Sequence, residues 1–136
     1  MKTKNMLIVL TLALTLSLTA CSIFRGDIEL KGTSWSLVEI HGQPILDGTT
    51  PTLVFDEEEL GGNGSCNTFG GNFTLDNGKL TIDQLFSTMM YCEDAMDQES
   101  AYINALQEAV GFQIKNGNLQ LQDADGQVTL AFAPQN

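Results

Sequence analysis

Most of the chain after residue 30 alternates apolar and polar residues with a period of two, which is typical of half-buried β-strands. Asn77-Gly78 separates two of these segments, and Asn116-Gly117 separates two others. Asn-Gly between alternating segments predicts a β-hairpin, because a type I′ turn requires positive φ at both central residues. A third turn at 123–126 completes a predicted C-terminal meander of three antiparallel strands. The alternating apolar residues are Trp35, Leu37, Leu53, Phe55, Phe69, Phe73, Leu75, Leu80, Ile82, Phe112, Ile114, Leu119, Leu121, Val128, Leu130 and Phe132.

Residues 95–110 are the exception, because their apolar residues recur every three to four positions, as on one face of a helix. The expected core-facing stripe consists of Met96, Ile103, Leu106 and Val110, with Tyr102 beside it. Acidic residues at the start suit the helix dipole, and Gly111 is the expected C′ residue. The prediction is an α+β domain, mainly β: a small antiparallel barrel or meander of about seven to eight strands. Its helix, near residues 95–110, covers an open edge or one end of the barrel.

Trp35 is the only tryptophan, and it lies in the first alternating segment. Val38 and Ile40 are expected on the opposite face of that strand. Burial of the indole in the core is the expected role. The alternative is that Trp35 lines the mouth of the barrel with Phe69 and Phe73, as in small ligand-binding barrels.

The first 20 residues do not share this pattern. Lys2 and Lys4 precede a leucine-rich run over residues 6–18, followed by small residues, which is the order of a secretory signal. The run is shorter than the roughly 20 apolar residues of a transmembrane helix. Leu18-Thr19-Ala20-Cys21 resembles the bacterial lipoprotein box, in which the cysteine receives a lipid before cleavage. We therefore expect a lipoprotein signal peptide at 1–20, and an acylated Cys21 with a short tether at 21–31.

The resemblance to a lipoprotein implies a location in the bacterial cell envelope. Thioether-linked diacylglycerol and a further acyl chain such as palmitate would anchor Cys21 in a membrane, because each buried methylene contributes about 0.8 kcal/mol. Ser22 replaces the Asp that retains enteric lipoproteins at the inner membrane, which favours the outer membrane with the domain facing the periplasm. Ordinary secretion with an unmodified cysteine is the alternative.

Charge narrows the possible partners of this 136-residue chain. It has 6 basic and 17 acidic residues, a net charge of −11. Loss of Lys2 and Lys4 with the signal leaves four basic residues and a net charge of −13. Such acidity argues against nucleic acid, whose phosphates require Lys and Arg, and against electrostatic docking on anionic lipid. The length is sufficient for one domain.

Three motifs carry a family resemblance. Gly32-Thr33-Ser34-Trp35 opens the domain, the segment 64–71 reads Gly-Ser-Cys-Asn-Thr-Phe-Gly-Gly, and Thr88-Met89-Met90-Tyr91-Cys92 precedes the acidic helix. Together they resemble the META domain (HslJ-like) family from about residue 30 to 132, and we expect the domain at 32–136. The resemblance implies a small mixed β domain with one helix, often on envelope lipoproteins, with links to heat shock and novobiocin resistance and no known catalytic residue. A structural role is expected at the matching positions, which are Trp35, Gly64, Cys66, Asn67, Phe69, Gly71, Thr88, Met90 and Cys92.

Cys66 and Cys92 have three possible states. The expected envelope location is oxidising, where disulfides persist. A disulfide between residues 26 apart stabilises a fold by about 3 kcal/mol in the chain-entropy model. The alternatives are two separate thiols or a redox pair, and the absence of Cys-x-x-Cys weakens the redox reading.

Other chemical motifs are incomplete. The glycine-rich stretch 61–71 lacks the Lys of a phosphate-binding loop, and barrel bulges and curvature explain its glycines better. Within it, Asn67 is expected to hydrogen-bond a bent backbone rather than a substrate. Asp56–Glu59 is expected to be a solvated hairpin turn. Asp123-x-Asp125-Gly126 resembles part of a calcium loop, but the twelfth position is Pro134 rather than Glu. Weak cation binding is the alternative at both places.

His41 is the single histidine, and it precedes Gly42 in an expected turn. A single histidine removes most metal sites and most catalytic triads, and no Gly-x-Ser-x-Gly sequence accompanies it, so no catalytic residue, metal or cofactor is expected. The sequence predicts a non-enzymatic envelope lipoprotein that contributes to tolerance of heat or antibiotic stress by binding an unknown envelope component. The alternative is a small-molecule or peptide binding module that uses an apolar pocket of the barrel. An enzyme is the third and least favoured class.

Overall fold

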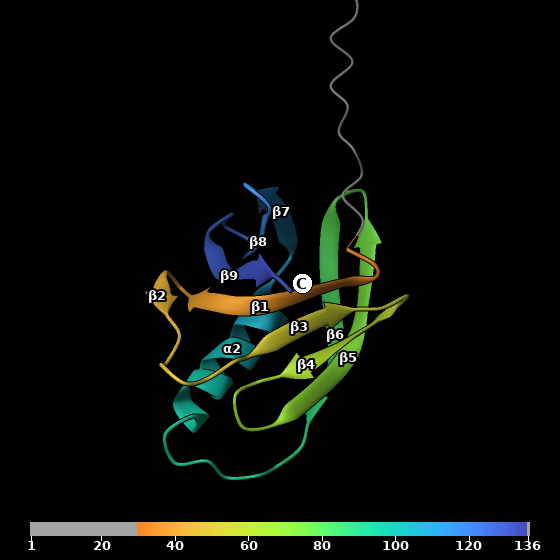
Figure 1. The fold of residues 1–136 in the computed structure, drawn as a ribbon. Helices are drawn as coiled ribbons and strands as arrows, with labels where there is room; N and C mark the ends of the chain where they lie inside the picture. The colour runs from red at the N-terminus through yellow and green to blue at the C-terminus, as the bar shows by residue number, and fades with distance from the viewer. Residues whose placement is uncertain (1–29, 136) are drawn as a thin grey trace, which may run out of the picture.

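The computed structural model describes residues 30–135 (Figure 1). Eight strands form a closed antiparallel ring in the order β1-β3-β4-β5-β6-β7-β8-β9, in which β9 pairs with β1, and the two-residue strand β2 extends the edge beside β1. The predicted fold class is therefore confirmed. The strands are β1 (Thr33–Ile40), β2 (Gln43–Pro44), β3 (Thr52–Phe55), β4 (Glu59–Asn63), β5 (Thr68–Asp76), β6 (Lys79–Ser87), β7 (Gly111–Lys115), β8 (Asn118–Gln122) and β9 (Val128–Pro134). The helix is α2 (Met96–Glu108).

The predicted turns join these strands. Asn77-Gly78 connects β5 to β6 with φ of 50° and 81°, and Asn116-Gly117 connects β7 to β8 with φ of 53° and 81°. His41-Gly42 makes the same kind of turn between β1 and β2. The acidic turn between β3 and β4 is closed by the Asp56 N–H, which donates to the Glu59 carbonyl at 2.8 Å. Local sequence thus sets the hairpins, and the predicted C-terminal meander is confirmed.

Aromatic and aliphatic side chains fill the interior of the barrel. The rings of Phe55 and Phe73 meet edge to face with centroids 4.9 Å apart, and Tyr102 of α2 meets Phe69 at 5.5 Å. Trp35 is buried in the same core, and its indole N–H donates to Thr33 Oγ1 at 2.7 Å. Trp35 therefore lies in the core, and the interior is packed rather than hollow at these residues.

One face assignment in β1 was wrong. Val38 and Ile40 were expected on the same face, but Val38 is exposed while Ile40 is buried with Leu37. The register of β1 against β9 shifts between Leu37 and Glu39. This bulge adds one residue to the strand and so moves Ile40 to the core face.

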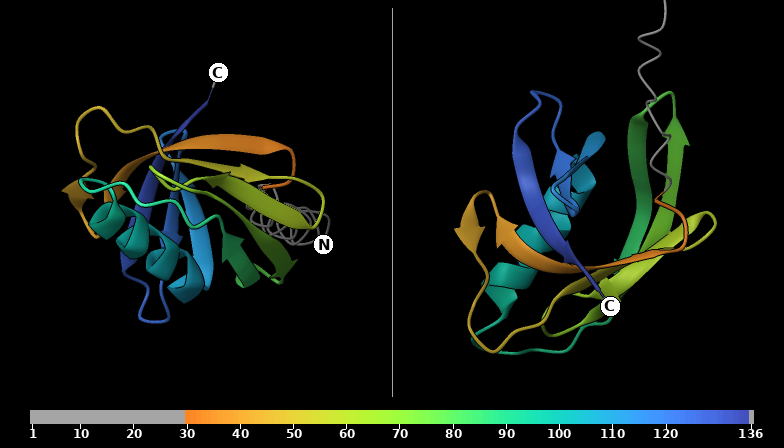
Figure 2. Two further views of the ribbon diagram at one scale, coloured as in Figure 1. Left: turned by 90° about the horizontal axis from the view of Figure 1, so that it is seen from below. Right: turned by 45° about the horizontal axis from the view of Figure 1, so that its top comes forward.

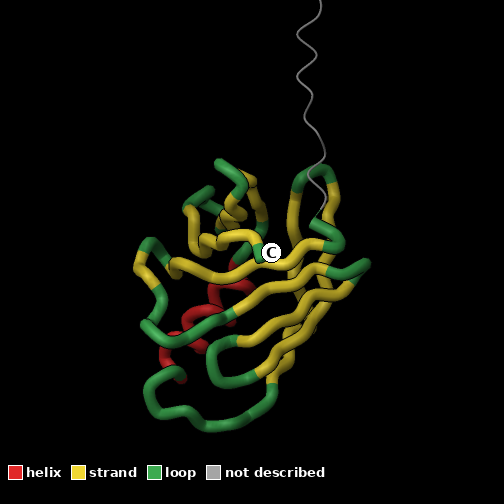
Figure 3. Tube along the Cα trace, viewed as in Figure 1, coloured by secondary structure: helices red, strands yellow, loops and turns green. Residues whose placement is uncertain are grey.

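The ring is weakest between β6 and β7, where Lys79 and Gly111 form the single pair. α2 contacts β6, β9 and β1, and it lies along one side of the curved sheet (Figures 2 and 3). Tyr102, Ala105 and Leu106 are its buried apolar residues. The helix was expected to cover an open edge or one end of the barrel, and its position beside the weakly paired β6 agrees with this expectation.

The C-terminal end of the helix differs from the prediction. α2 ends at Glu108, the extended residue Ala109 follows, and Gly111 is the first residue of β7. Gly111 is therefore not a C′ residue. The Val110 N–H already donates to the Gln122 carbonyl, so the chain enters the sheet directly and needs no left-handed residue at this junction. Within residues 30–135, no helix is long and apolar enough to cross a bilayer.

Candidate functional site

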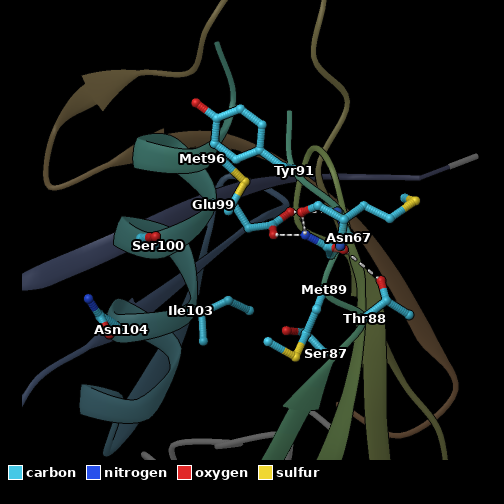
Figure 4. A pocket seen from close by; sticks show the side chains of 11 residues that line it. Asn67, Ser87, Thr88, Met89, Tyr91, Met96, Glu99, Ser100, Ile103 and Asn104 are labelled. Carbon is cyan, nitrogen blue, oxygen red and sulfur yellow. Dashed lines mark hydrogen bonds between the residues drawn. The ribbon is translucent and has the colours of Figure 1, made fainter. Parts of the chain in front are cut away.

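Asn67 is the centre of a buried polar network beside α2. The side chain is 2% exposed, and its Oδ1 accepts from the Met90 N–H at 2.7 Å and from the Thr88 hydroxyl at 2.8 Å. Its Nδ2 donates to the Met90 carbonyl at 3.0 Å and to Glu99 Oε1 at 2.6 Å (Figure 4). Both side-chain atoms of Asn67 therefore make two hydrogen bonds each, which is the normal capacity of an amide. We call Asn67, Thr88, Glu99 and the backbone of Cys66 and Met90 the polar clamp.

Glu99 joins the polar clamp to the helix. Its Oε2 accepts from the backbone N–H of Cys66 at 2.9 Å and of Asn67 at 2.7 Å, and its side chain is 6% exposed. Burial raises the pKa of this carboxyl, but the hydrogen bonds from Asn67 and Cys66 outweigh burial and hold the pKa below its ordinary value. Glu99 is therefore a carboxylate at neutral pH. The sequence assigned it only to the helix dipole, so its buried role was missed.

Gly64 is needed because Glu99 lies against it. A Cβ at position 64 would lie 2.7 Å from Glu99 Oε2 and 2.9 Å from its carboxyl carbon. The Gly64 N–H also donates to the Asn67 carbonyl at 2.7 Å, which folds the chain into a tight turn before β5. The contact explains why glycine precedes Cys66-Asn67 in this motif.

The remaining motif residues lie around the same turn. Phe69 is buried against Tyr102, as described above. Gly71 lies at a bulge between β5 and β6, where a Cβ would be 2.9 Å from the Asp83 carbonyl. The Thr88 N–H donates to the Thr68 carbonyl, which continues the pairing just beyond β6. The two motifs therefore meet in space although about 20 residues separate them.

The structure joins Cys66 and Cys92 in a disulfide, with a Cα–Cα distance of 5.8 Å. The disulfide is the first of the three states considered from sequence. It lies next to the polar clamp, because Cys66 donates its N–H to Glu99. Residues 88–92 are thus tied to the barrel by hydrogen bonds at Thr88 and Met90 and by a covalent bond at Cys92.

Large apolar side chains project into solvent from residues 86–91, which overlap the tied segment. Phe86 is 70% exposed, Met89 97% and Tyr91 79%, and Met90 is also exposed. We call residues 86–91 the exposed segment. Its apolar side chains are outside the core, while the Thr88 hydroxyl and the Met90 N–H donate to Asn67 and fix the segment in place.

A cleft of about 570 Å³ lies between α2 and residues 87–91. Met89, Met96 and Ile103 contribute apolar walls, and Ser100 and Asn104 add polar groups on the helix (Figure 4). Met96 and Ile103, predicted to face the core, are only partly buried because this side of the helix borders the cleft. The volume is in the range of ligand-binding pockets.

The surroundings of the cleft are acidic. Between Lys79 and Lys115 the sequence has no Lys, Arg or His. The acidic residues of this interval are Asp83, Glu93, Asp94, Asp97, Glu99 and Glu108. Glu99 is held in the polar clamp, whereas Glu93, Asp94 and Asp97 are exposed and lie close in sequence to the cleft-lining residues Tyr91 and Met96.

The other sequence candidates lie away from this site. Asp123 Oδ1 accepts the N–H groups of Asp125 and Gln127 at 3.0 and 2.9 Å, so it closes its own turn. His41 is exposed in the β1–β2 turn. Among the described residues, no group of three His, Cys, Asp or Glu side chains is placed to hold a metal ion. Cys21 and the predicted signal peptide lie outside the described residues.

The fold and the site define a class: a closed eight-stranded antiparallel barrel with one helix, whose Gly-x-Cys-Asn turn is bonded to that helix. Residues 28–136 match the META domain, and the chain belongs to this family. It is 30% identical over 108 residues to the heat shock protein HslJ of Escherichia coli (strain K12), covering 79% of this chain and 72% of that protein.

Solved structures agree with the fold. An NMR structure of a protein from Burkholderia xenovorans is similar with a TM-score of 0.63 and 28% identity, covering 79% of this chain and 84% of that one. A crystal structure of a DUF4847 family protein from Bacteroides vulgatus is similar with a TM-score of 0.58, covering 81% of this chain and 98% of that one. Its identity is 16%, so this second likeness concerns the fold alone.

Proposed function

We propose that this chain is a lipid-anchored envelope protein that acts by binding another envelope component, without catalysis, and so contributes to tolerance of heat or antibiotic stress. The observation that carries the proposal is the exposed segment. Contiguous exposed apolar side chains such as Met89 and Tyr91 are typical of interaction sites in soluble domains. The stress role is supported by the relative in Escherichia coli, which is named a heat shock protein.

The polar clamp supports binding rather than catalysis. General acid–base chemistry needs a group that can reach the reacting atoms of a substrate. Both carboxylate oxygens of Glu99 accept hydrogen bonds from the protein, and the amide of Asn67 is fully used. Three of the roughly four acceptor positions of the Glu99 carboxylate are taken by the protein, so these buried polar groups are used mainly to hold the chain in place.

The alternative function, a pocket for a small apolar ligand, would use the cleft. The barrel interior is filled by the aromatic cluster around Phe55, Phe73 and Tyr102. The cleft beside α2 lies outside that cluster and is lined in part by the exposed segment. A ligand or a protein partner would therefore use the same surface.

Photocrosslinking in living cells tests the proposal. A photoreactive amino acid replaces Met89 in one strain and Glu57, at the exposed β3–β4 turn, in a control strain, each with and without heat stress. We expect a defined envelope component to be captured from position 89 and not from position 57. Equal capture from both positions, or none from position 89, would contradict the proposal.

The lipid anchor requires its own test. Cells are labelled with a palmitate analogue, and the wild-type chain is compared with Cys21→Ala. Label on the wild-type chain that is absent from the variant, together with loss of the variant from the membrane fraction, supports the anchor at Cys21. An unlabelled wild-type chain in the soluble periplasmic fraction would contradict it.

A further inference from the structure

We propose that the cleft between α2 and the exposed segment binds a cationic amphipathic peptide segment of an envelope partner. Its apolar side chains would pack on Met89, Met96 and Ile103, and its basic side chains would lie near the surrounding carboxylates. This inference rests on the proposed binding function and names the chemistry of the partner.

The apolar part of the surface suits side chains of varied shape. Met89 and Met96 lie on opposite sides of the cleft, one on the exposed segment and one on α2. Methionine is unbranched and polarisable, so surfaces rich in it adapt to different apolar partners. Phe86 is also exposed, but its ring lies over Gly70, where a Cβ would be 2.6 Å from the ring, and it does not line the cleft.

Charge selects the partner. Glu93, Asp94 and Asp97 are exposed where the exposed segment leads into α2, and Glu108 is exposed at the other end of the helix. With no basic side chain between Lys79 and Lys115, this surface attracts a cationic segment. It repels a second copy of the same acidic face and the anionic headgroups of a membrane.

The surface is also organised before binding. The Met90 backbone is bonded to Asn67 at both its N–H and its carbonyl, and Cys92 is covalently tied to Cys66. A segment that is already fixed loses little conformational entropy when a partner docks. A preformed groove with apolar walls and a charged rim is typical of amphipathic helix recognition.

Fluorescence anisotropy with the full-length protein in non-ionic detergent tests the inference, with empty micelles as the baseline. The probe is a labelled helix-forming peptide with leucine on one face and lysine on the other. We expect saturable binding that weakens with salt, and about tenfold weaker binding for Met89→Ser, a change of about 1.4 kcal/mol. The double variant Glu93→Gln/Asp97→Asn should bind more weakly at low salt and lose part of the salt dependence, whereas Glu57→Gln should bind like the wild type.

Three results would overturn the inference. The first is equal binding of a peptide in which glutamate replaces every lysine. The second is unchanged binding by Met89→Ser. The third is a preference of the exposed segment for lipid vesicles or for a second copy, seen as vesicle sedimentation or as dimerisation that Met89→Ser abolishes. If position 89 is crosslinked in cells but the peptide does not bind in the anisotropy measurement, this inference alone is wrong. If the crosslink is absent, the proposed function is contradicted.

Discussion

In the barrel, aromatic rings such as those of Phe55 and Phe73 are buried in the interior. Beside α2, polar side chains are buried and large apolar side chains are exposed. There Asn67 and Glu99 are buried, and Met89 is almost fully exposed. The barrel is stabilised by non-directional apolar burial. The end beside α2 is held by directional hydrogen bonds, which fix a backbone while leaving apolar side chains free to meet a partner.

Removing an aromatic ring from the barrel should have the largest effect on stability. Phe55 is fully buried, so Phe55→Ala should lower the free energy of unfolding by about 3–5 kcal/mol through lost burial and a cavity. Val54→Ala, in the same strand with its side chain exposed, is the matched control and should cost far less. Urea denaturation measures both. Equal losses for the two variants would mean that the interior is not the main source of stability.

Removing the disulfide comes next. The double variant Cys66→Ala/Cys92→Ala should be less stable by about 3 kcal/mol, because the unfolded chain gains freedom over the 26-residue separation. Denaturation of the wild type with and without reductant gives an independent measure of the same difference. If reductant leaves the wild type unchanged while the double variant is destabilised, the loss comes from packing at these positions and not from the covalent bond.

Loss of the Glu99 carboxylate should lower the free energy of unfolding by a similar or smaller amount than loss of the disulfide. Glu99→Gln replaces one acceptor oxygen by a donor, which should cost about 2–3 kcal/mol at neutral pH. Folding lowers the pKa of Glu99, so its ionic contribution is complete above the unfolded pKa of about 4.3 and is lost as pH falls through the folded pKa. The variant should therefore lose less stability than the wild type between neutral and acidic pH.

Asp97→Asn is the control for this pH dependence, because Asp97 lies in the same helical turn but is exposed. Free energies of unfolding of the three proteins at neutral pH and near pH 3, measured by denaturant titration, provide the comparison. Parallel acid losses in wild type and Glu99→Gln would show that the carboxylate is not the group responsible.

The smallest effect on stability should come from the exposed segment. Met89→Ala removes a side chain that touches little of the protein, so the free energy of unfolding should change by less than about 0.5 kcal/mol. Capture of the proposed envelope partner should nevertheless fall sharply. Thermal unfolding and crosslinking from the neighbouring position Tyr91 measure the two quantities. A large loss of stability would place Met89 among the structural residues and remove the contrast with Phe55.

The hairpins were predictable because their chemistry is local. Asn77-Gly78 and Asn116-Gly117 adopt left-handed φ because glycine has no Cβ and asparagine tolerates this region better than most residues. The bulge at Val38 was not predictable, because it depends on the register between β1 and β9, which are about 90 residues apart. A period-two pattern has no information about where the extra residue lies.

The polar clamp was also not predictable in full, because it joins residues that are distant in the sequence. The family motifs identified Cys66, Asn67 and Thr88, but not Glu99, which accepts hydrogen bonds from Cys66 and Asn67 and is 32 residues from Asn67. On a helical wheel Glu99 is one of several acidic residues in an acidic turn. Its three-residue spacing from Tyr102 places it on the buried side, and this was the one signal that could have singled it out.

Amide hydrogen exchange at Met90 tests the central claim most directly, because the claim is that buried hydrogen bonds fix a backbone whose apolar side chains remain exposed. The Met90 N–H donates to Asn67 Oδ1, and the Phe73 N–H, which donates to the Glu58 carbonyl, represents the barrel. We predict that Met90 exchanges slowly, like Phe73, and that Glu99→Gln accelerates exchange at Met90 while Phe73 stays protected. Exchange at Met90 as fast as in an unstructured peptide would contradict the account.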